Sequence, residues 1–435
     1  MTKTFYSIFI FFFSTTFTVF AQPTTSSPYS KFGLGDLVSP SLPQNKAMGG
    51  ISVGLRKLGS YSSINVANPA SYSSIDLTTF DMGAGASFRQ LDASSAYNNN
   101  VNMNLSHIVF GVPVSKKSAI SFGLLPYSEM GYQYKNSSTL VNTTDNTSTS
   151  IDYIYGGDGG LSKVYMGYGI LLSPHLSVGV NAAYLFGNLK QSKSTEFPQD
   201  TKALNSRQEA SSGISGLSMD YGVQYIINTL SKSKLTIGYA GTISDKFTAA
   251  GSTKSSVYRK NFSSGDESIS LGTPYTLDDT SSELSMPIMQ TIGFAFEKAN
   301  KFLVGADFSY AQWSNFRWGA INPGLNDSYT VVVGGQVTPN VNAISGYFKL
   351  VDYRFGLKYN KTFVNINNTS IDQYAVTLGL GLPLAANRLA FYKINFSAEI
   401  GMRGRLDNGL VRENYVNLGL GFTINDKWFI KPKFD

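Results

Sequence analysis

The sequence predicts an all-β fold, a closed antiparallel transmembrane β-barrel of about 14 strands with an N-terminal hatch segment inside it. Three observations lead to this prediction. Segments of alternating hydrophobicity recur along the chain, the connections between them alternate between short and long, and a secretory signal precedes them. The composition agrees, because 14% charged residues is low for a soluble protein, whereas 13% aromatic residues and 42 glycines suit strands with aromatic rims and one face of small residues.

The segment 163–186 shows the alternation most clearly. Val164, Met166 and Tyr168 share one face of its first arm, and glycines occupy much of the other face. The second arm follows after Ser173-Pro174-His175 and repeats the pattern. A period of two with one apolar face predicts a tight antiparallel hairpin. Comparable strands begin at Thr78 and recur at roughly 101–114, 118–134, 212–227, 233–248, 288–297, 302–313, 327–337, 351–360, 371–382, 389–402 and 413–424.

The connections between these strands supply an independent test. Short turns alternate almost throughout with long polar connections, as periplasmic turns alternate with extracellular loops in outer-membrane barrels. A soluble β-sandwich would show the same alternation of residues, but it has no reason to keep this alternation of loops. The long connections are expected at 135–162, 191–211 and 249–287, and the exception is 338–350, which is long but falls on the periplasmic side.

The charged residues of these strands lie opposite the apolar face. Tyr353 and Phe355, for example, alternate with Arg354. A charge that faces lipid near the bilayer midplane costs about 2–4 kcal/mol, so the polar faces must line a lumen. Eight charged side chains are therefore predicted to point inward: Asp81, Arg89, Asp220, Asp307, Arg354, Lys358, Lys393 and Glu399.

The N-terminus predicts export. Residues 1–21 combine a basic Lys3, a short apolar core and a small-x-small ending at Ala21, which is typical of a secretory signal peptide. The chain has no cysteine and therefore no disulfide, and no later apolar run is long enough for a transmembrane helix. We expect a Gram-negative outer-membrane protein with a leader and hatch at 22–77, a barrel at 78–424 and a periplasmic tail at 425–435.

Two short motifs lie just before the first strand, Ala47-Met48-Gly49-Gly50 and Asn68-Pro69-Ala70. In this position they resemble the N-terminal hatch of outer-membrane transporters of the FadL type. Later segments are also similar to that family, namely Gly160-Leu161, Pro287, Trp313-Ser314-Asn315-Phe316, and Thr338-Pro339-Asn340 before Tyr353-Arg354-Phe355-Gly356.

The resemblance implies a hatch-closed barrel that imports long-chain fatty acids and other hydrophobic compounds and releases them sideways through a kinked strand. It implies hatch or gating roles for Gly49, Gly50, Asn68, Pro69 and Ala70, although Asn-Pro-Ala also suits an ordinary turn. The opening segment SPYSKFGLGDL (27–37) has no counterpart in that family, and the chain continues past the last strand. Such extra segments also suit docking surfaces for another protein.

Residues for catalysis or metal binding are scarce. His107 and His175 are the only histidines, and they fall on different predicted elements. His175 lies in a predicted periplasmic turn and His107 has no carboxylate nearby in sequence, which favours neither a zinc site nor a hydrolase. Gly157-Asp158-Gly159-Gly160 lacks the features of a calcium or phosphate loop, and Asp278-Asp279 with Glu283 suits a solvated loop better than a cation site. We expect no enzyme activity, no metal and no cofactor.

Partners are predicted from charge and from the expected membrane location. The formal net charge is +7, but the lysines and arginines are scattered, so we expect membrane lipid and no nucleic acid as partners. The first functional hypothesis is passive uptake of hydrophobic small molecules, with Phe262, Tyr275, Phe316 and Trp318 capturing the ligand in the outer loops. The alternative is a structural barrel subunit of a larger outer-membrane assembly, with other outer-membrane or periplasmic proteins as partners.

Overall fold

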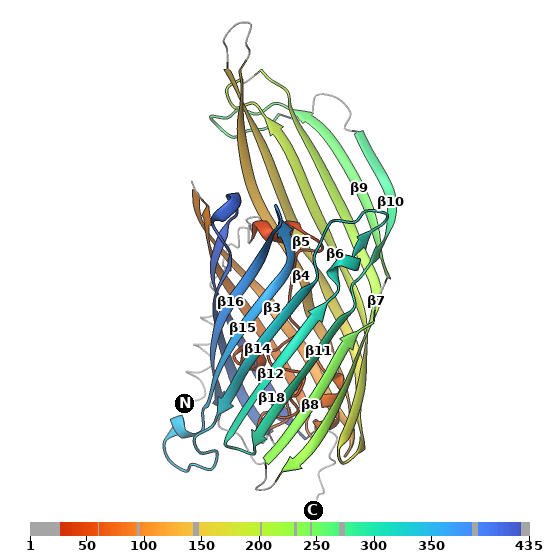
Figure 1. The fold of residues 1–435 in the computed structure, drawn as a ribbon, viewed down its shortest axis with the longest axis vertical. Helices are drawn as coiled ribbons and strands as arrows, with labels where there is room; N and C mark the ends of the chain where they lie inside the picture. The colour runs from red at the N-terminus through yellow and green to blue at the C-terminus, as the bar shows by residue number, and fades with distance from the viewer. Residues whose placement is uncertain are drawn as a thin grey trace, which may run out of the picture.

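The computed structural model describes residues 27–427, apart from 60, 94–95, 142–147, 201, 230–232, 244–245, 269–274 and 385–389. The predicted signal peptide at 1–21 and the tail beyond Lys427 lie outside the described residues. All described strands belong to one antiparallel sheet, which closes on itself where β18 (Arg412–Asp426) pairs with β2 (Thr78–Ala93) (Figure 1). The predicted fold class, a closed transmembrane barrel with an N-terminal plug, is confirmed.

The wall consists of 14 strands in chain order. Two neighbouring strands are each interrupted by a break. On the periplasmic side of the break β8 pairs with β11, and on the outer side β9 pairs with β10. One interrupted strand is β8 (Ser233–Thr242) with β9 (Lys246–Tyr258), and the next is β10 (Tyr275–Ser285) with β11 (Met289–Lys298). The other wall strands are β3 (Ala96–Ser115), β4 (Ser118–Val141), β5 (Ser148–Ser173), β6 (Leu176–Glu196), β7 (Asn205–Thr229), β12 (Phe302–Ala311), β14 (Ser328–Val337), β15 (Asp352–Ile366), β16 (Thr369–Pro383) and β17 (Ala390–Gly404).

Short elements complete the fold. The N-terminal segment contains η1 (Pro28–Lys31), β1 (Asp36–Leu37), α2 (Pro43–Lys46) and η2 (Pro69–Ser74), and the connections contain η4 (Trp313–Asn315), β13 (Arg317–Trp318), η5 (Tyr347–Lys349) and η6 (Asp407–Gly409). Following the loop rule, we call the end with the short turns the periplasmic end and the opposite end the outer end. None of the helices within 27–427 is long and apolar enough to cross a membrane.

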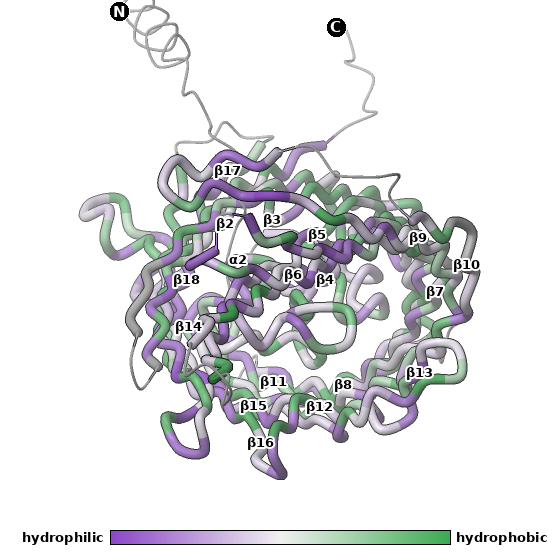
Figure 2. Tube along the Cα trace, turned by 90° about the horizontal axis from the view of Figure 1, so that it is seen from above, coloured by the Kyte–Doolittle hydropathy of each residue, from purple (hydrophilic) through white to green (hydrophobic). Residues whose placement is uncertain are grey.

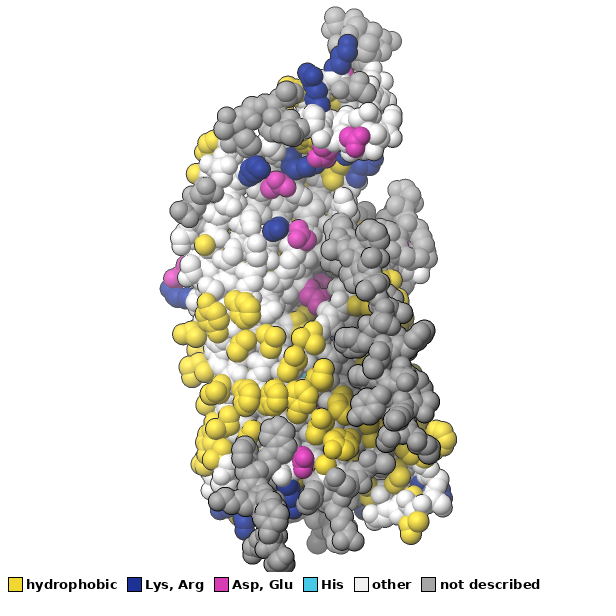
Figure 3. All heavy atoms as spheres, turned by 180° about the vertical axis from the view of Figure 1, so that it is seen from behind, with side chains coloured by type: hydrophobic (Ala, Val, Ile, Leu, Met, Phe, Trp, Pro, Cys, Tyr) yellow, Lys and Arg dark blue, Asp and Glu magenta, His cyan; other side chains and the backbone are white. Residues whose placement is uncertain are grey.

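Apolar side chains cover the outside of the barrel toward its periplasmic end. Figure 3 shows them as a band with a largely polar region above it. Met166 and Leu217, on the apolar faces of β5 and β7, are 62% and 73% exposed, as is expected of side chains that face lipid. Their strand neighbours on the other face are small or polar, so the alternation read from the sequence separates lipid from lumen.

Above the band, β4 to β7 together with β9 and β10 continue as a tall sheet, which we call the outer sheet (Figure 1). The long connections predicted at 135–162, 191–211 and 249–287 are therefore mostly strand, since β5 alone runs for 26 residues and β7 for 25. The sequence pattern missed these extensions because both faces of the outer sheet are rich in Ser, Thr and charged residues. Without one apolar face, a strand does not show the alternation on which the prediction relied.

The wall is split between β3 and β4 toward the outer end. These strands pair only from Ile108–Leu124 to Ser115–Ser118. Beyond that point the edge of β4 pairs with β1 instead, with Asp36 opposite Glu129 and Leu37 opposite Ser128. The N-terminal segment thus takes the place beside β4 that β3 leaves open.

Candidate functional site: the plugged lumen

Two consecutive segments fill the lumen. The leader, residues 27–37, lies near the outer end, and the hatch, residues 38–77, leads from there to the start of β2 at the periplasmic end. Seen from above, the chain crosses the inside of the ring of strands (Figure 2). Most of the described hatch residues are buried, although few of them belong to regular structure.

The hatch approaches the wall most closely at wall glycines. Ala47–Gly50 packs on β14, β15 and β16, and Asn68–Ala70 packs on β5, β6 and β7, which are on the opposite side of the ring. A Cβ on any of these wall glycines would overlap hatch atoms, most of them backbone, so the close approach requires the missing side chain. The glycines are Gly334, Gly356 and Gly379 on one side and Gly169, Gly179 and Gly222 on the other.

Gly49 and Gly50 form the turn after α2. Their φ angles of +75° and +97° lie in the left-handed region that favours glycine. The Gly49 amide donates to Thr377 Oγ1 at 2.7 Å, and the Thr377 hydroxyl donates to the Ala47 carbonyl at 3.1 Å. The predicted hatch motif is thus a fixed turn that is bonded to β16.

The middle of the hatch is held through its backbone. The amides of Ser52 and Val53 donate to Asp307 Oδ2 on β12 at 2.7 and 3.0 Å. From β7, the Gln224 side chain donates to the carbonyls of Val53 and Leu55, both at 2.9 Å. Asp307 and Gln224 together thus satisfy two amides and two carbonyls of this part of the hatch and anchor it to two strands of the wall.

Asn68-Pro69-Ala70 acts both as a helix start and as a wall contact. Asn68 Oδ1 caps η2 by accepting from the Ala70 amide at 3.1 Å, and Pro69 occupies the first helical position. Asn68 Nδ2 donates to the Val53 carbonyl at 2.8 Å and so ties η2 to the middle of the hatch.

A buried charge cluster holds the periplasmic part of the hatch. Arg354 donates to the Tyr61 hydroxyl at 3.1 Å and pairs with Asp352 at 3.0 Å. Lys393 also pairs with Asp352, and its ammonium lies 3.8 Å from the centre of the Tyr61 ring. Each of these charges has a partner, which is the condition for placing them in a closed interior.

Asp81 joins four elements. It lies 2.8 Å from His107 Nε2 on β3, accepts from Thr423 on β18 at 2.7 Å and from Gln44 of α2 at 3.3 Å. Asp81 could not be recognised as the partner of His107 from sequence spacing, because the register between β2 and β3 brings the two side chains together. His107 is fully buried and also lies beside the Ser106 hydroxyl at 3.2 Å, so the imidazole serves as a cross-link in the wall.

The other residues predicted to line the lumen also lie within polar pairs. Asp220 pairs with Lys163 at 2.6 Å, and Lys358 faces Glu399 at 3.5 Å. Tyr415 donates to the same Glu399 carboxylate at 3.0 Å. The lumen charges therefore act mainly between wall strands, or between wall and plug, and not as a free lining.

The leader is held by ion pairs from two wall strands and by a hydrogen bond to a third. Asp36 binds Arg403 of β17 at 2.7 Å and Arg89 of β2 at 3.2 Å, and the Ser27 hydroxyl donates to Glu413 of β18. Burial alone would raise the pKa of the Asp36 carboxyl, but the charges of Arg403 and Arg89 outweigh it and hold that pKa below its usual value.

Apolar residues at the outer end surround the rest of the leader. Leu34 is fully buried in a cluster that we call the outer basin, and Tyr29 is buried there too. The Trp313 and Phe363 rings of the basin stack at 4.4 Å, and both lie beside Gly33 of the leader. The outer basin is formed by Trp313, Phe316, Leu325, Phe363, Val364 and Leu410, with further residues of the outer sheet.

The structure brings together only part of the predicted capture set. Phe316 is buried in the outer basin and Trp318 packs against it. Tyr275 is 67% exposed at the start of β10, and Phe262 lies under Lys260 in the turn that follows β9. Sequence reasoning missed Trp313, Phe363 and the leader's own Leu34, because their neighbourhood depends on loops that meet only in the folded chain.

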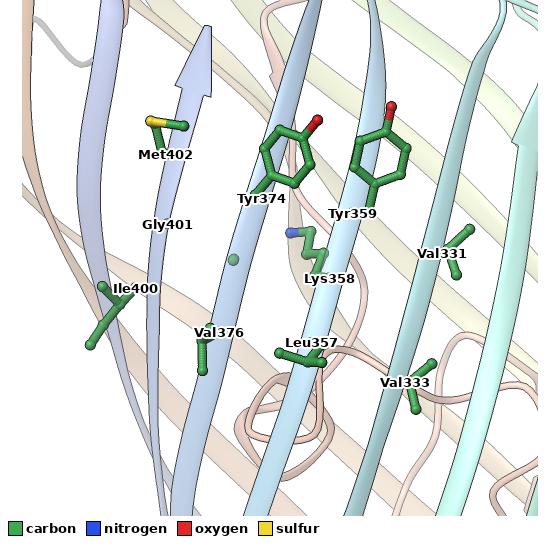
Figure 4. A pocket seen from close by; sticks show the side chains of 11 residues that line it. Val331, Val333, Leu357, Lys358, Tyr359, Tyr374, Val376, Ile400, Gly401 and Met402 are labelled. Carbon is green, nitrogen blue, oxygen red and sulfur yellow. The ribbon is translucent and has the colours of Figure 1, made fainter.

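A separate apolar groove lies on the lipid-facing side of the wall. It has a volume of about 540 Å³ and runs over β14 to β17. Figure 4 shows the Tyr359 and Tyr374 rings side by side at one end of it, with Leu357 and Val376 further along their strands. Because Tyr359, Tyr374, Leu357 and Val376 belong to the outward faces of their strands, this groove meets lipid and is distinct from the lumen.

The described residues offer no metal centre. They contain no group of three or more His, Cys, Asp or Glu side chains placed to hold an ion. The side chains of Asp278 and Asp279 are outside what the structure describes. Gly157–Gly160, predicted to precede a strand, lies within β5, where Gly159 has a φ of +119°.

Similar folds occur among solved outer-membrane channels. The Pseudomonas putida toluene transporter TodX aligns with a TM-score of 0.58 at 13% identity, over 91% of this chain and 100% of that one. A Pseudomonas aeruginosa FadL homologue aligns with a TM-score of 0.58 at 11% identity, over 91% and 100%. The Ralstonia pickettii toluene transporter TbuX aligns with a TM-score of 0.55 at 12% identity, over 88% and 98%. These alignments confirm the FadL-type fold that the hatch motifs predicted.

By its fold, the protein is thus a transmembrane β-barrel of the FadL type with an N-terminal plug. A family model described as BamG matches residues 1–435, and the chain belongs to the BamG family. A comparison with curated proteins gave no match.

Proposed function

We propose that the protein resides in the outer membrane and takes up hydrophobic small molecules, such as long-chain fatty acids, through its outer end. The observation that carries this proposal is the outer basin, an aromatic and aliphatic site that now encloses Leu34 and Tyr29 of the leader. An apolar ligand that displaced these two side chains would find the same neighbours. The solved channels with this fold are described as toluene and monoaromatic hydrocarbon channels or a FadL homologue, which supports the class of ligand.

The proposed exit is lateral, through the split between β3 and β4. It lies above the hatch, so a ligand could leave toward the membrane without moving the hatch from its wall glycines. The obstacle on this path is the leader, because β1 is paired to the edge of β4 there. Uptake is therefore expected to require displacement of the leader, and gating belongs to 27–37 more than to Gly49, Gly50 or Asn68–Ala70.

Reconstituted vesicles test the proposal. Liposomes with the full chain should accumulate labelled fatty acid faster than empty liposomes, and a variant lacking residues 27–37 should do so faster still. A small polar dye serves as the control, because a merely leaky barrel would admit both. Fatty-acid flux equal to that of empty vesicles, for both forms, would reject uptake as the function.

A second function is favoured by the way the plug is attached. Hydrogen bonds and ion pairs tie the hatch and leader to strands on all sides of the ring, as a permanent filling would be tied. This suits a barrel that serves as a structural subunit of a larger outer-membrane assembly. Native mass spectrometry from mild detergent separates the two functions, since a subunit should keep its protein partners and a solitary transporter should appear as a monomer.

A further inference from the structure

The connection 338–350 differs from the other periplasmic turns. Figure 1 shows it at the foot of β14 and β15, standing out sideways from the wall. Backbone hydrogen bonds give it a defined shape, because the Asn340 amide donates to the Lys349 carbonyl at 2.8 Å and the Leu350 amide to the Tyr347 carbonyl at 2.9 Å. The connection is therefore an ordered loop that protrudes from the wall, and we call it the protrusion.

Apolar side chains form the tip of this protrusion. Ile344 is 105% exposed, Phe348 75% and Tyr347 46%. The tip joins the lipid-facing band of the wall, because the Tyr353 hydroxyl on β15 donates to the Phe348 carbonyl at 3.1 Å. Large apolar side chains held in water are unfavourable by about 25 cal/mol per Å², so such a surface signals a partner.

Lysines surround the same protrusion. Lys349 belongs to it, and Lys298 and Lys301 lie in the neighbouring turn, whose Lys301 carbonyl accepts from the Thr338 amide at 2.9 Å. Other periplasmic turns carry Lys116 and Lys117. Within the described part of the chain, none of these five lysines takes part in an ion pair at 4.0 Å or less. Carboxylates near this end include Asp76, which Lys57 already pairs, and Asp352, which Arg354 and Lys393 pair. Glu297 lies beside Lys234, and Asp426 ends β18.

We propose that this surface is an anchor for anionic phospholipid in the leaflet at the periplasmic end. Ile344, Tyr347 and Phe348 insert at the boundary between headgroups and acyl chains, while Lys298, Lys301 and Lys349 bind lipid phosphates. Two observations favour a lipid surface over a protein. The apolar tip continues the lipid-facing band, and the lysines follow the rim from turn to turn, as a flat anionic surface would require.

The position of the tip can be measured directly, because the chain contains no cysteine. A single Ile344→Cys variant is labelled with an environment-sensitive dye and reconstituted in vesicles of phosphatidylethanolamine and phosphatidylglycerol. Lipids brominated near the headgroup should quench the dye, and aqueous iodide should not. Leu140→Cys on the outer sheet, which is 58% exposed, is the matched control and should respond to iodide alone. Iodide quenching at position 344 without lipid quenching would overturn the proposal and point to a protein partner.

The role of the lysines is tested separately. After extraction from mixed nanodiscs, the chain should retain phosphatidylglycerol over phosphatidylethanolamine. Replacing Lys298, Lys301 and Lys349 by glutamine should lower that preference by roughly fivefold per lysine. The same change at three exposed lysines of the outer sheet, Lys190, Lys193 and Lys254, removes equal charge and should leave the preference unchanged. Equal loss in both triple variants would show that only net charge matters and would overturn the assigned site.

Discussion

The hatch and the leader are consecutive pieces of one plug, yet they are attached to the wall in different ways. The hatch meets the wall through its backbone, packed on wall glycines and bonded to Thr377, Asp307 and Gln224. The leader meets it through side chains, with ion pairs at Asp36 and apolar contacts at Tyr29 and Leu34. Where backbone packs directly on a wall glycine, neither chain can shift without losing the contact. Side chains can change rotamer, so their contacts can break and form again.

This difference predicts different stabilities within one plug. Removing the hatch would leave backbone-sized gaps along both sides of the ring. Removing the leader would take the Asp36 carboxylate from Arg403 and Arg89 and would open an apolar basin that a ligand can refill. We therefore expect the hatch to unfold only with the barrel and the leader to open locally.

The largest effect is expected from filling a wall glycine. Gly356→Val places a side chain where the Met48–Gly49 backbone lies, so either the hatch or β15 must move. We expect a loss of more than about 3 kcal/mol in the free energy of unfolding, or failure to form the heat-modifiable barrel on electrophoresis. Gly213→Ala is the control, because the nearest atom to its new Cβ is 3.8 Å away. Similar stabilities of the two variants would contradict the tight packing of the hatch.

Loss of the Asp307 carboxylate should have the next largest effect. Asp307→Ala leaves the Ser52 and Val53 amides unpaired in the interior, which should reduce the free energy of unfolding in urea by about 2–4 kcal/mol. Asp307→Asn keeps one oxygen and should lose less. The idea that this carboxylate anchors the hatch fails if Ala and Asn behave alike.

Asp36→Asn should detach the leader without weakening the barrel. The substitution removes the charge that binds Arg403 and Arg89, so residues 27–37 should exchange amide hydrogens faster and become sensitive to protease. Global unfolding should change by less than about 1 kcal/mol, because these ion pairs join the leader to the wall and do not join one wall strand to another, so their loss opens the leader locally. Unchanged protection of the leader in this variant would show that apolar contacts hold it by themselves.

Acid should produce a weaker form of the same release. The pKa of Asp36 is lowered in the folded chain, so its ion pairs stabilise the leader above the ordinary carboxyl pKa of about 4, and this stabilisation is lost as pH falls through the lowered value. Trp313 is 1% exposed beside the leader, and its quenching by iodide should rise in that range. The Asp36→Asn variant should show no such step, and a step of equal size in both proteins would assign it to another group.

Much of the wall could be predicted from the sequence, because successive side chains of a strand point to opposite faces. Once the apolar face is assigned to lipid, every other side chain must point into the lumen. The charges at Arg354 and Lys393 therefore fell on the lumen side. Their partners could not be predicted, since Tyr61 reaches Arg354 from 293 positions away in sequence. Likewise, the register of β2 and β3 and not sequence spacing pairs Asp81 with His107.

The sequence predicted where in the chain the plug lies, but not which wall residues it contacts. Gly49-Gly50 and Asn68-Pro69 are residue pairs typical of turns, so the sequence predicts turns before β2. Only the structure shows which wall strands these turns contact. In the leader, the sequence offered one indication of structure: apolar residues such as Tyr29 and Leu34 occur in a stretch rich in Gly and Ser, which suggested that the segment packs against something. The outer sheet was missed because polar residues on both faces leave no periodic signal.

The closure between β18 and β2 has a consequence for how the chain folds. This seam joins Arg412 to Asp92 and Asp426 to Thr78, so the ring is completed only when the last strand meets the first. The hatch also contacts strands on both sides of this seam, because Gln44 reaches Asp81 of β2 and the Tyr61 ring lies beside Lys393 of β17. Pairing segments so distant in sequence is slow, and a preassembled hatch would give the growing sheet a surface to curve around. Once β18 has paired with β2, the closed ring surrounds the hatch on every side.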